Sequence, residues 1–152
     1  MATTGLPNWP WQHAEADALP APERLIIDAA RAWAAAALQG RPRPAALRQI
    51  LATENAEAAT EAMEGLLTPL AQRPLTLGCP LCPRLIGAEP GLLLALACAQ
   101  RQRRREALAL LLRQAAPRDA YAAMAAAVAL GAHLRSAGLL FQEPWSRVQE
   151  EG

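Results

Sequence analysis

The chain has 152 residues and a formal net charge of +1, and this length suits a single domain. It contains 37 Ala and 25 Leu but four Ile and two Val. Alanine and leucine favour helices and β-branched residues favour strands, so the composition predicts an all-α protein, a compact bundle of about five or six helices. The near-neutral charge argues against a general attraction to nucleic acid or anionic membranes.

The sequence also suggests a compartment. Three cysteines are too few for a disulfide framework. The first residues lack the apolar core of a signal peptide, and no apolar run is suited to crossing a bilayer. We therefore expect a cytoplasmic protein without a membrane span.

Residues 1–21 are predicted to form an extended arm that packs on the domain. Trp9 and Trp11 stand two positions apart among prolines, so both rings can lie on one surface. Docking of this arm on a partner protein is the alternative.

Three helices are predicted in the first half of the domain, at residues 22–39, 45–52 and 56–72. Pro22 and Gly40 have the residue types that begin and end helices. The buried stripe of the first helix is expected to contain Leu25, Ile26, Ala29, Trp33 and Ala37.

Four glutamates follow helical spacing near and along residues 56–72, namely Glu54, Glu57, Glu61 and Glu64. The two helices 45–52 and 56–72 have lengths that suit a helix-turn-helix. Carboxylates on the recognition face would repel phosphates, however, so we expect no DNA binding through this helix. A solvated face is the simplest interpretation, and an acidic docking face is the alternative.

The second half is predicted to contain helical segments at residues 89–100, 103–115 and 117–137. Residues 103–115 either continue the helix before them or form the second arm of a hairpin. Leu108, Leu111 and Leu112 are among the leucines expected in the core. In the last helix four larger apolar residues repeat at helical spacing, and the alanines between them should allow close helix packing. These four are Tyr121, Met124, Val128 and Leu134. Residues 139–152 form an apolar tail that we expect to fold back.

A basic corner lies between two of these helices and comprises Arg101, Arg103, Arg104 and Arg105. Arginine clusters bind phosphate or nucleic acid in some proteins. Without interleaved aromatic residues, a solvated corner is the favoured interpretation. Pairing with the glutamate stripe, within the chain or between chains, remains open.

Residues 74–87 are predicted to join the two halves of the domain (residues 22–73 and 88–138) through a Cys-Pro-Leu-Cys turn. Cys79 and Cys82 have the spacing of a zinc knuckle and of a redox-active pair. Cys98, His133 and His13 are the other soft ligands. With half a zinc site present and no strand-helix context for redox chemistry, we favour a purely structural turn, and zinc is not the favoured cofactor.

The function expected from these features is a non-catalytic protein-protein interaction or assembly module, or one that self-associates. The alternative is a small zinc-binding or thiol-redox protein centred on Cys79 and Cys82, with any zinc shared between two subunits. Neither a Gly-rich phosphate loop nor a recognisable nucleophile-base pair is present, so the sequence does not favour an enzyme.

Overall fold

A computed structural model describes Trp11 and residues 13–143 and has no strand among them, which confirms the all-α prediction. The described residues form six α-helices: α1 (Ala21–Leu38), α2 (Arg43–Leu51), α3 (Thr60–Leu70), α4 (Glu89–Gln100), α5 (Arg104–Leu112) and α6 (Pro117–Ser136). Three short 3-10 helices accompany them: η1 (Ala16–Ala18), η2 (Ala52–Glu54) and η3 (Glu57–Ala59). No helix in this part of the chain is long and apolar enough to cross a membrane.

Proline and glycine set several helix boundaries. Prolines occupy the first turns of α1, α2, α4 and α6, where a missing N–H costs nothing. Gly40 and Gly138 follow α1 and α6 with φ of 66° and 79°, a conformation that suits glycine. The predicted helix at residues 56–72 is shorter than expected, because Glu57–Ala59 form a 3-10 turn and α3 runs from Thr60 to Leu70.

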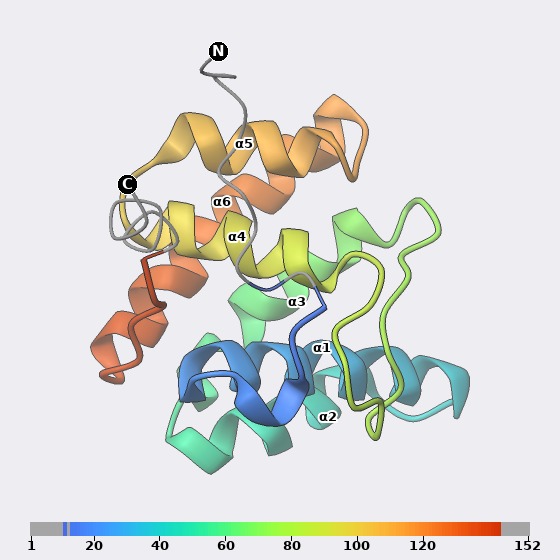
Figure 1. The fold of residues 1–152 in the computed structure, drawn as a ribbon. Coiled ribbons are helices and arrows are strands. Elements are labelled where there is room, and N and C mark those ends of the chain that lie inside the picture. Colours follow the sequence, from blue (N-terminus) through green and yellow to red (C-terminus); the bar gives the residue numbers. More distant parts are fainter. Residues whose placement is uncertain (1–10, 12, 144–152) are drawn as a thin grey trace.

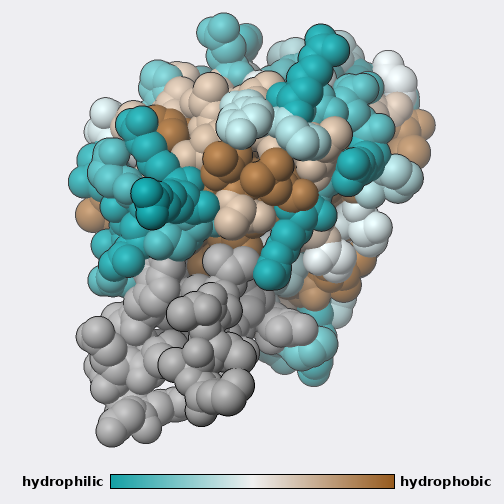
Figure 2. All heavy atoms as spheres, turned by 90° about the horizontal axis from the view of Figure 1, so that it is seen from above, coloured by the Kyte–Doolittle hydropathy of each residue, from teal (hydrophilic) through white to brown (hydrophobic). Residues whose placement is uncertain are grey.

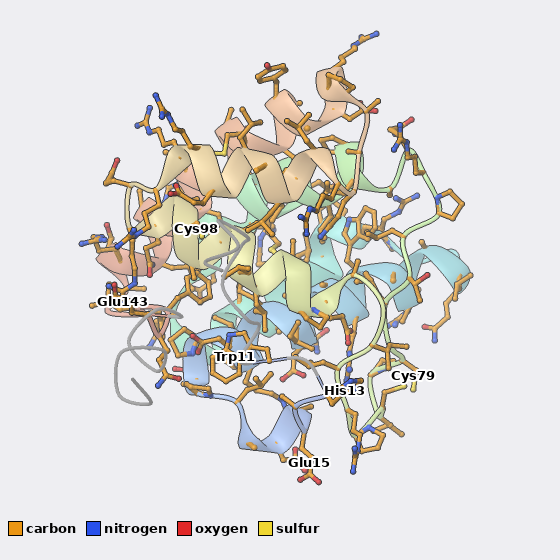
Figure 3. The ribbon with its side chains drawn as sticks, turned by 45° about the horizontal axis from the view of Figure 1, so that its top comes forward. Trp11, His13, Glu15, Cys79, Cys98 and Glu143 are labelled. Carbon is orange, nitrogen blue, oxygen red and sulfur yellow. The ribbon has the colours of Figure 1, made fainter. Side chains whose placement is uncertain are left out.

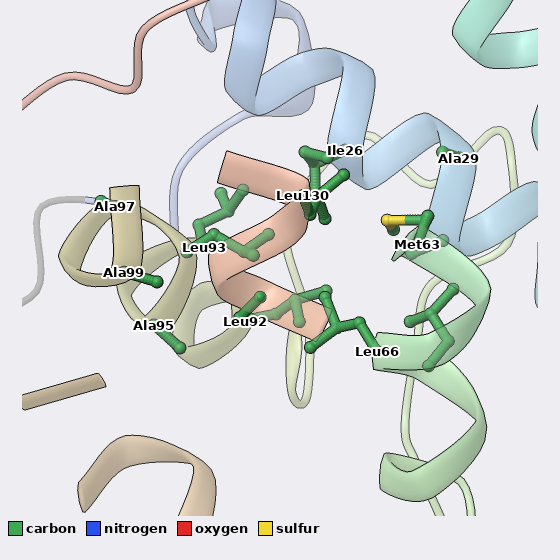
Figure 4. Close-up of a cluster of buried hydrophobic side chains, with 14 of the residues drawn as sticks. Ile26, Ala29, Met63, Leu66, Leu92, Leu93, Ala95, Ala97, Ala99 and Leu130 are labelled. Atoms are coloured by element: carbon green, nitrogen blue, oxygen red, sulfur yellow. The ribbon is translucent and has the colours of Figure 1, made fainter. Parts of the chain in front are cut away.

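The two halves of the chain share one core. In Figure 1 α4 crosses the middle of the molecule, with α5 above it and α1 and α2 below. The most extensive helix-helix packing joins α3 to α6, so it links the first half to the second. Figure 4 shows the centre of this core, where Met63, Leu66, Leu92 and Leu130 come together from α3, α4 and α6.

Helix α6 packs through small side chains. Its buried face consists of Ala120, Ala123, Ala127, Leu130, Gly131 and Leu134. A Cβ added to Gly131 would lie 3.1 Å from the Cα of Gln100 in α4. The expected close approach of neighbouring helices is therefore present.

Three residues expected in the core or among the apolar repeats lie at the surface instead. Ala37 is exposed, and Ala36 takes its place on the buried face of α1. Leu112 ends α5 and is 40% exposed. Tyr121 is 61% exposed, because the first turns of α6 bury Ala120 and Ala123 instead.

The segment after α6 folds back onto the bundle as far as it is described. Leu139 and Phe141 are buried. The side chain of Gln100 donates to the carbonyls of Gly131 and Leu139 and accepts from the N–H of Phe141, at 3.1, 3.0 and 2.8 Å. One buried amide thus fixes the start of the tail.

Candidate dithiol site

The loop between α3 and α4, whose path Figure 1 shows, contains the two cysteines. Backbone hydrogen bonds hold this loop in place. The N–H of Cys82 donates to the carbonyl of Cys79 at 3.0 Å and closes the predicted turn. Residues near the N-terminus pair with the loop: Ala16 donates to Pro83 at 2.8 Å, and Leu85 donates to Ala14 at 3.0 Å. The loop is therefore supported along one side of the turn.

A buried ion pair holds the other side. The guanidinium of Arg31 in α1 contacts both carboxylate oxygens of Glu89 at 2.7 and 2.9 Å, and both side chains are almost fully buried. Arg31 also donates to the carbonyls of Cys82 and Arg84 at 2.8 and 3.0 Å. Burying a charged pair is favourable only with such additional hydrogen bonds. The Arg31–Glu89 pair, called the clamp below, therefore holds the loop and is itself stabilised by the loop backbone.

Glu89 completes the clamp through the loop backbone. Its carboxylate accepts from the N–H of Gly78 at 3.0 Å and from the N–H of Ile86 at 2.9 Å. A Cβ on Gly78 would lie 2.7 Å from an Nη atom of Arg31. Glycine is needed at position 78 because the guanidinium passes directly over the backbone there.

The two thiols meet at the surface of this loop. The sulfur atoms of Cys79 and Cys82 are 2.8 Å apart, and the N–H of Cys79 lies 3.2 Å from the sulfur of Cys82. Cys79 is exposed, and Cys82 is half-buried. A reactant in solution can therefore reach Cys79 first.

The contact between the thiols shifts the pKa values of Cys79 and Cys82 in opposite directions. The hydrogen bond from Cys82, followed by the backbone N–H of Leu81, lowers the pKa of Cys79. The same sulfur-sulfur contact raises the pKa of Cys82. The charge of Arg31 lowers the pKa of both thiols to a smaller extent. Either sulfur can donate in the contact between the two thiols, and the N–H of Cys79 also stabilises charge on the Cys82 sulfur.

The other soft ligands do not join this pair. Figure 3 shows Cys98 in α4, on the far side of the molecule from Cys79. Cys98 is buried, and burial raises its pKa to about 12. No group of three His, Cys, Asp or Glu side chains suited to a metal occurs among the described residues, which include His13 and His133.

The site differs from a thioredoxin-like one. Neither cysteine begins a helix, since α4 starts at Glu89, and the described residues contain no sheet. Cys79 therefore has hydrogen bonds and the charge of Arg31, in place of a helix dipole, to lower its pKa.

Of the predicted partner surfaces, the tryptophan arm is described in part. Trp11 is buried in the core cluster. Trp9 lies outside the described residues.

The four glutamates of the predicted acidic stripe fall on η2, η3 and α3. Glu54, Glu57 and Glu61 are exposed, and Glu64 is half-buried. Within the described part of the chain no ion pair joins this stripe to the arginine corner.

Two residues of the arginine corner contact the segment after α6, and the other two are exposed on α5. Arg101 donates to the carbonyl of Phe141 at 2.7 Å, and Arg103 lies 3.8 Å from Glu143. Arg104 and Arg105 are exposed in the first turn of α5, and neither has an ion-pair partner among the described residues.

Sequence reasoning found the thiols but missed the clamp. Arg31 interrupts the apolar stripe of α1, next to Ala30 and one turn from Ile27, both of which are buried. A charged residue on the core side of a helix was the available signal, since arginine is seldom fully buried without a partner. Nothing in the sequence pointed to Glu89 as that partner.

No family model, curated protein or solved structure matches this chain.

Proposed function

We propose that the chain is a thiol-redox protein whose working group is the Cys79–Cys82 dithiol. The 2.8 Å separation of an exposed and a half-buried sulfur carries this proposal. A disulfide bond is about 2.05 Å long, so the sulfurs need to approach by less than about 1 Å. Low-pKa, accessible cysteines beside a resolving cysteine are typical of redox-responsive sites.

The reaction is thiol-disulfide exchange with a partner disulfide as the oxidant. The Cys79 thiolate attacks one sulfur of that disulfide, forming a mixed disulfide and releasing one thiolate. Cys82 then loses its proton and attacks the Cys79 sulfur, which releases the second partner thiolate. The dithiol becomes a disulfide, the partner disulfide becomes two thiols, and the proton balance is met by the solvent.

Incubation with oxidised glutathione followed by mass spectrometry tests this function. We expect an intramolecular disulfide between Cys79 and Cys82 in the parent chain and a stable glutathione adduct on Cys79 in Cys82→Ser. Cys79→Ser should react far more slowly. Cys98→Ala is the matched control and should behave like the parent, because Cys98 is buried.

Two results would contradict the redox function. One is equal reactivity of the three cysteines toward glutathione disulfide. The other is stoichiometric zinc, at one ion per chain or per dimer, in protein purified without chelator and absent from the Cys79→Ser/Cys82→Ser double variant. Zinc of that kind would favour a metal site shared between subunits.

The double variant itself should fold normally. The turn is held by Arg31, Glu89 and backbone hydrogen bonds, none of which uses a thiol hydrogen. A melting temperature equal to that of the parent is expected. A large decrease would mean that the thiols have a structural role.

We also propose a second function, that of a protein interaction module. The observation that favours it is the outward face of α5 and α6, where large apolar side chains lie at the surface. Exposed apolar surface beside polar residues is typical of protein contact sites. Sedimentation and binding measurements on variants of this face test it.

A further inference from the structure

Helix α6 leaves Tyr121 exposed and Met124 and Val128 partly exposed at the surface. Its fully buried face has three alanines, one glycine and two leucines, whereas Tyr121, Met124 and Val128 lie beside that face. Tyr121 is exposed, and the other two are half-buried. Met124 and Val128 pack partly against the core, and their exposed portions form an apolar stripe with Tyr121 on the outer side of α6.

Helix α5 supplies the second wall of a groove along this stripe. The groove has a volume of about 480 Å³ and is lined by Arg104, Leu108, Tyr121, Met124, Ala125 and Val128. Figure 2 looks onto the molecule from the α5 side and shows brown hydrophobic side chains between teal hydrophilic ones. Tyr121 and Val128 are seven positions apart, which corresponds to about 10 Å of helix. This length matches two turns of a partner helix.

The one charged residue that lines the groove among the described residues is an arginine. No carboxylate is among its lining residues. Arg104 and the adjacent Arg105 are exposed, and neither has an ion-pair partner among the residues that the structure describes. Arginine, tyrosine and methionine are also the side chains enriched in the centres of protein interfaces.

We infer that the α5–α6 groove binds an amphipathic helix of a partner protein that carries carboxylates beside its apolar stripe. Apolar residues of the partner at i, i+3 or i+4 and i+7 would cover Leu108, Met124 and Val128. Its carboxylates would meet Arg104 and Arg105. This inference rests on the interaction function proposed above and adds the class of the partner.

A second copy of the chain fits the groove less well. The acidic stripe is the described cluster of exposed carboxylates that a second copy could offer to Arg104 and Arg105. The apolar face of α3, however, is buried in its own core through Met63, Leu66, Leu67 and Leu70. The stripe therefore has no apolar ridge with which to fill the groove.

The test uses a panel of fluorescently labelled helical peptides of about 14 residues, or four turns. Each carries leucines at i, i+3 or i+4 and i+7, in three registers, with glutamates along both flanks. Control peptides have lysine in place of every glutamate. Fluorescence anisotropy with the full chain should show saturable binding of a glutamate peptide that weakens as salt rises, and no binding of its lysine counterpart.

Variants of the chain locate the site. We expect Tyr121→Ala and the pair Arg104→Ala/Arg105→Ala each to weaken binding of the glutamate peptide by about tenfold or more. Arg113→Ala, an exposed arginine after the last turn of α5, is the matched control and should bind normally. All of these positions are exposed, so unchanged circular dichroism is expected as the test of folding.

Three results would overturn the inference, and they separate its failure from that of the interaction function. If lysine peptides bind as well as glutamate peptides, the partner does not need carboxylates, and the acidic class of partner is wrong. Concentration-dependent dimerisation that is lost in Tyr121→Ala would make a second copy the occupant, and the interaction function would stand. If no peptide binds and the chain stays monomeric in sedimentation, both the inference and the interaction function of this face fail.

Discussion

Arg31 and Glu89 are separated by 58 positions in sequence and form the most buried charged contact of the described structure. Each has several partners: Arg31 contacts Glu89 and two loop carbonyls, and Glu89 also accepts from two loop N–H groups. These bonds offset the desolvation of both charges. The pair thus determines where the thiols lie, although neither residue reacts.

Glu89→Gln tests this contact directly. The change leaves the Arg31 charge buried without a counter-ion, so we expect the free energy of unfolding to fall by about 3–5 kcal/mol. Urea denaturation followed by circular dichroism measures it. Asp28→Asn removes a half-exposed partner of Arg24 and should cost about 1 kcal/mol or less. An equal decrease in the free energy of unfolding for the two variants would show that the buried pair stabilises the fold no more than the exposed pair does.

Glu23 makes the free energy of unfolding depend on pH. A carboxylate in an ion pair stabilises the fold as pH rises, whereas Glu23 should destabilise it. Its side chain is buried, and burial raises its pKa, although the N–H of Gln142 donates to it at 2.7 Å. Because the folded state binds this proton more tightly than the unfolded state, stability must fall as pH rises from the ordinary glutamate pKa through the raised one.

Glu23→Gln should remove this pH dependence. An amide keeps an oxygen that can accept from Gln142 but has no charge to desolvate. We expect the variant to match the parent at acidic pH and to be the more stable protein at neutral pH. Urea midpoints measured from pH 4 to pH 8 provide the comparison. A parent that gains stability relative to the variant as pH rises would contradict the expected direction of the effect.

At the scale of elements, the side chain of Gln100 at the end of α4 bonds both to α6 and to the tail. Gln100 is buried and bonds to three backbone groups, on Gly131, Leu139 and Phe141. Gly131 lets α6 approach this point, since a side chain there would meet the α4 backbone. The tail therefore depends on a polar contact as well as on the burial of Phe141.

Gln100→Ala should destabilise the domain and release the tail. It leaves buried backbone groups without partners, at about 1–3 kcal/mol for each unsatisfied group. We expect a loss of about 2 kcal/mol or more in urea denaturation, with faster hydrogen exchange at residues 139–143. Gln72→Ala, which removes an exposed hydrogen bond to Thr68, should change neither quantity. Unchanged hydrogen exchange at residues 139–143 in Gln100→Ala would show that the Gln100 side chain does not hold the tail.

At the scale of the whole molecule, two surfaces with different chemistry lie apart. Figure 1 shows the loop between α3 and α4 reaching the lower end of the molecule, whereas α5 lies at the top. The dithiol and the α5–α6 groove can therefore be altered independently. The acidic stripe lies on η2, η3 and α3 and has no cation paired with it in the described residues.

This distribution of charge predicts that the chain does not retard duplex DNA. The net charge is +1, and the carboxylates of the stripe repel phosphates. Electrophoretic mobility shifts at low and moderate salt measure the binding. Salt-sensitive retardation that disappears when Arg103, Arg104 and Arg105 are changed to alanine would show that the basic corner binds nucleic acid.

Much of the fold follows from local sequence. Alanine and leucine in place of β-branched residues predict helices, and proline or glycine at helix ends fixes several boundaries within a residue or two, because these preferences act through neighbouring residues. Glu89–Gln100 agrees with its expected bounds. The Cys-Pro-Leu-Cys turn was recognisable for the same reason, since its prolines restrict the backbone locally.

The tertiary structure decided which faces are buried and what surrounds the thiols. Helical spacing cannot tell whether α6 turns Tyr121 or its alanines inward, because the answer depends on how closely α3 and α4 approach. The pairing of Arg31 with Glu89 joins residues 58 positions apart, and neither partner alone indicates the other. Long-range contacts depend on the whole packed chain, so the acidity of Cys79 and the groove on α5 and α6 became visible only in three dimensions.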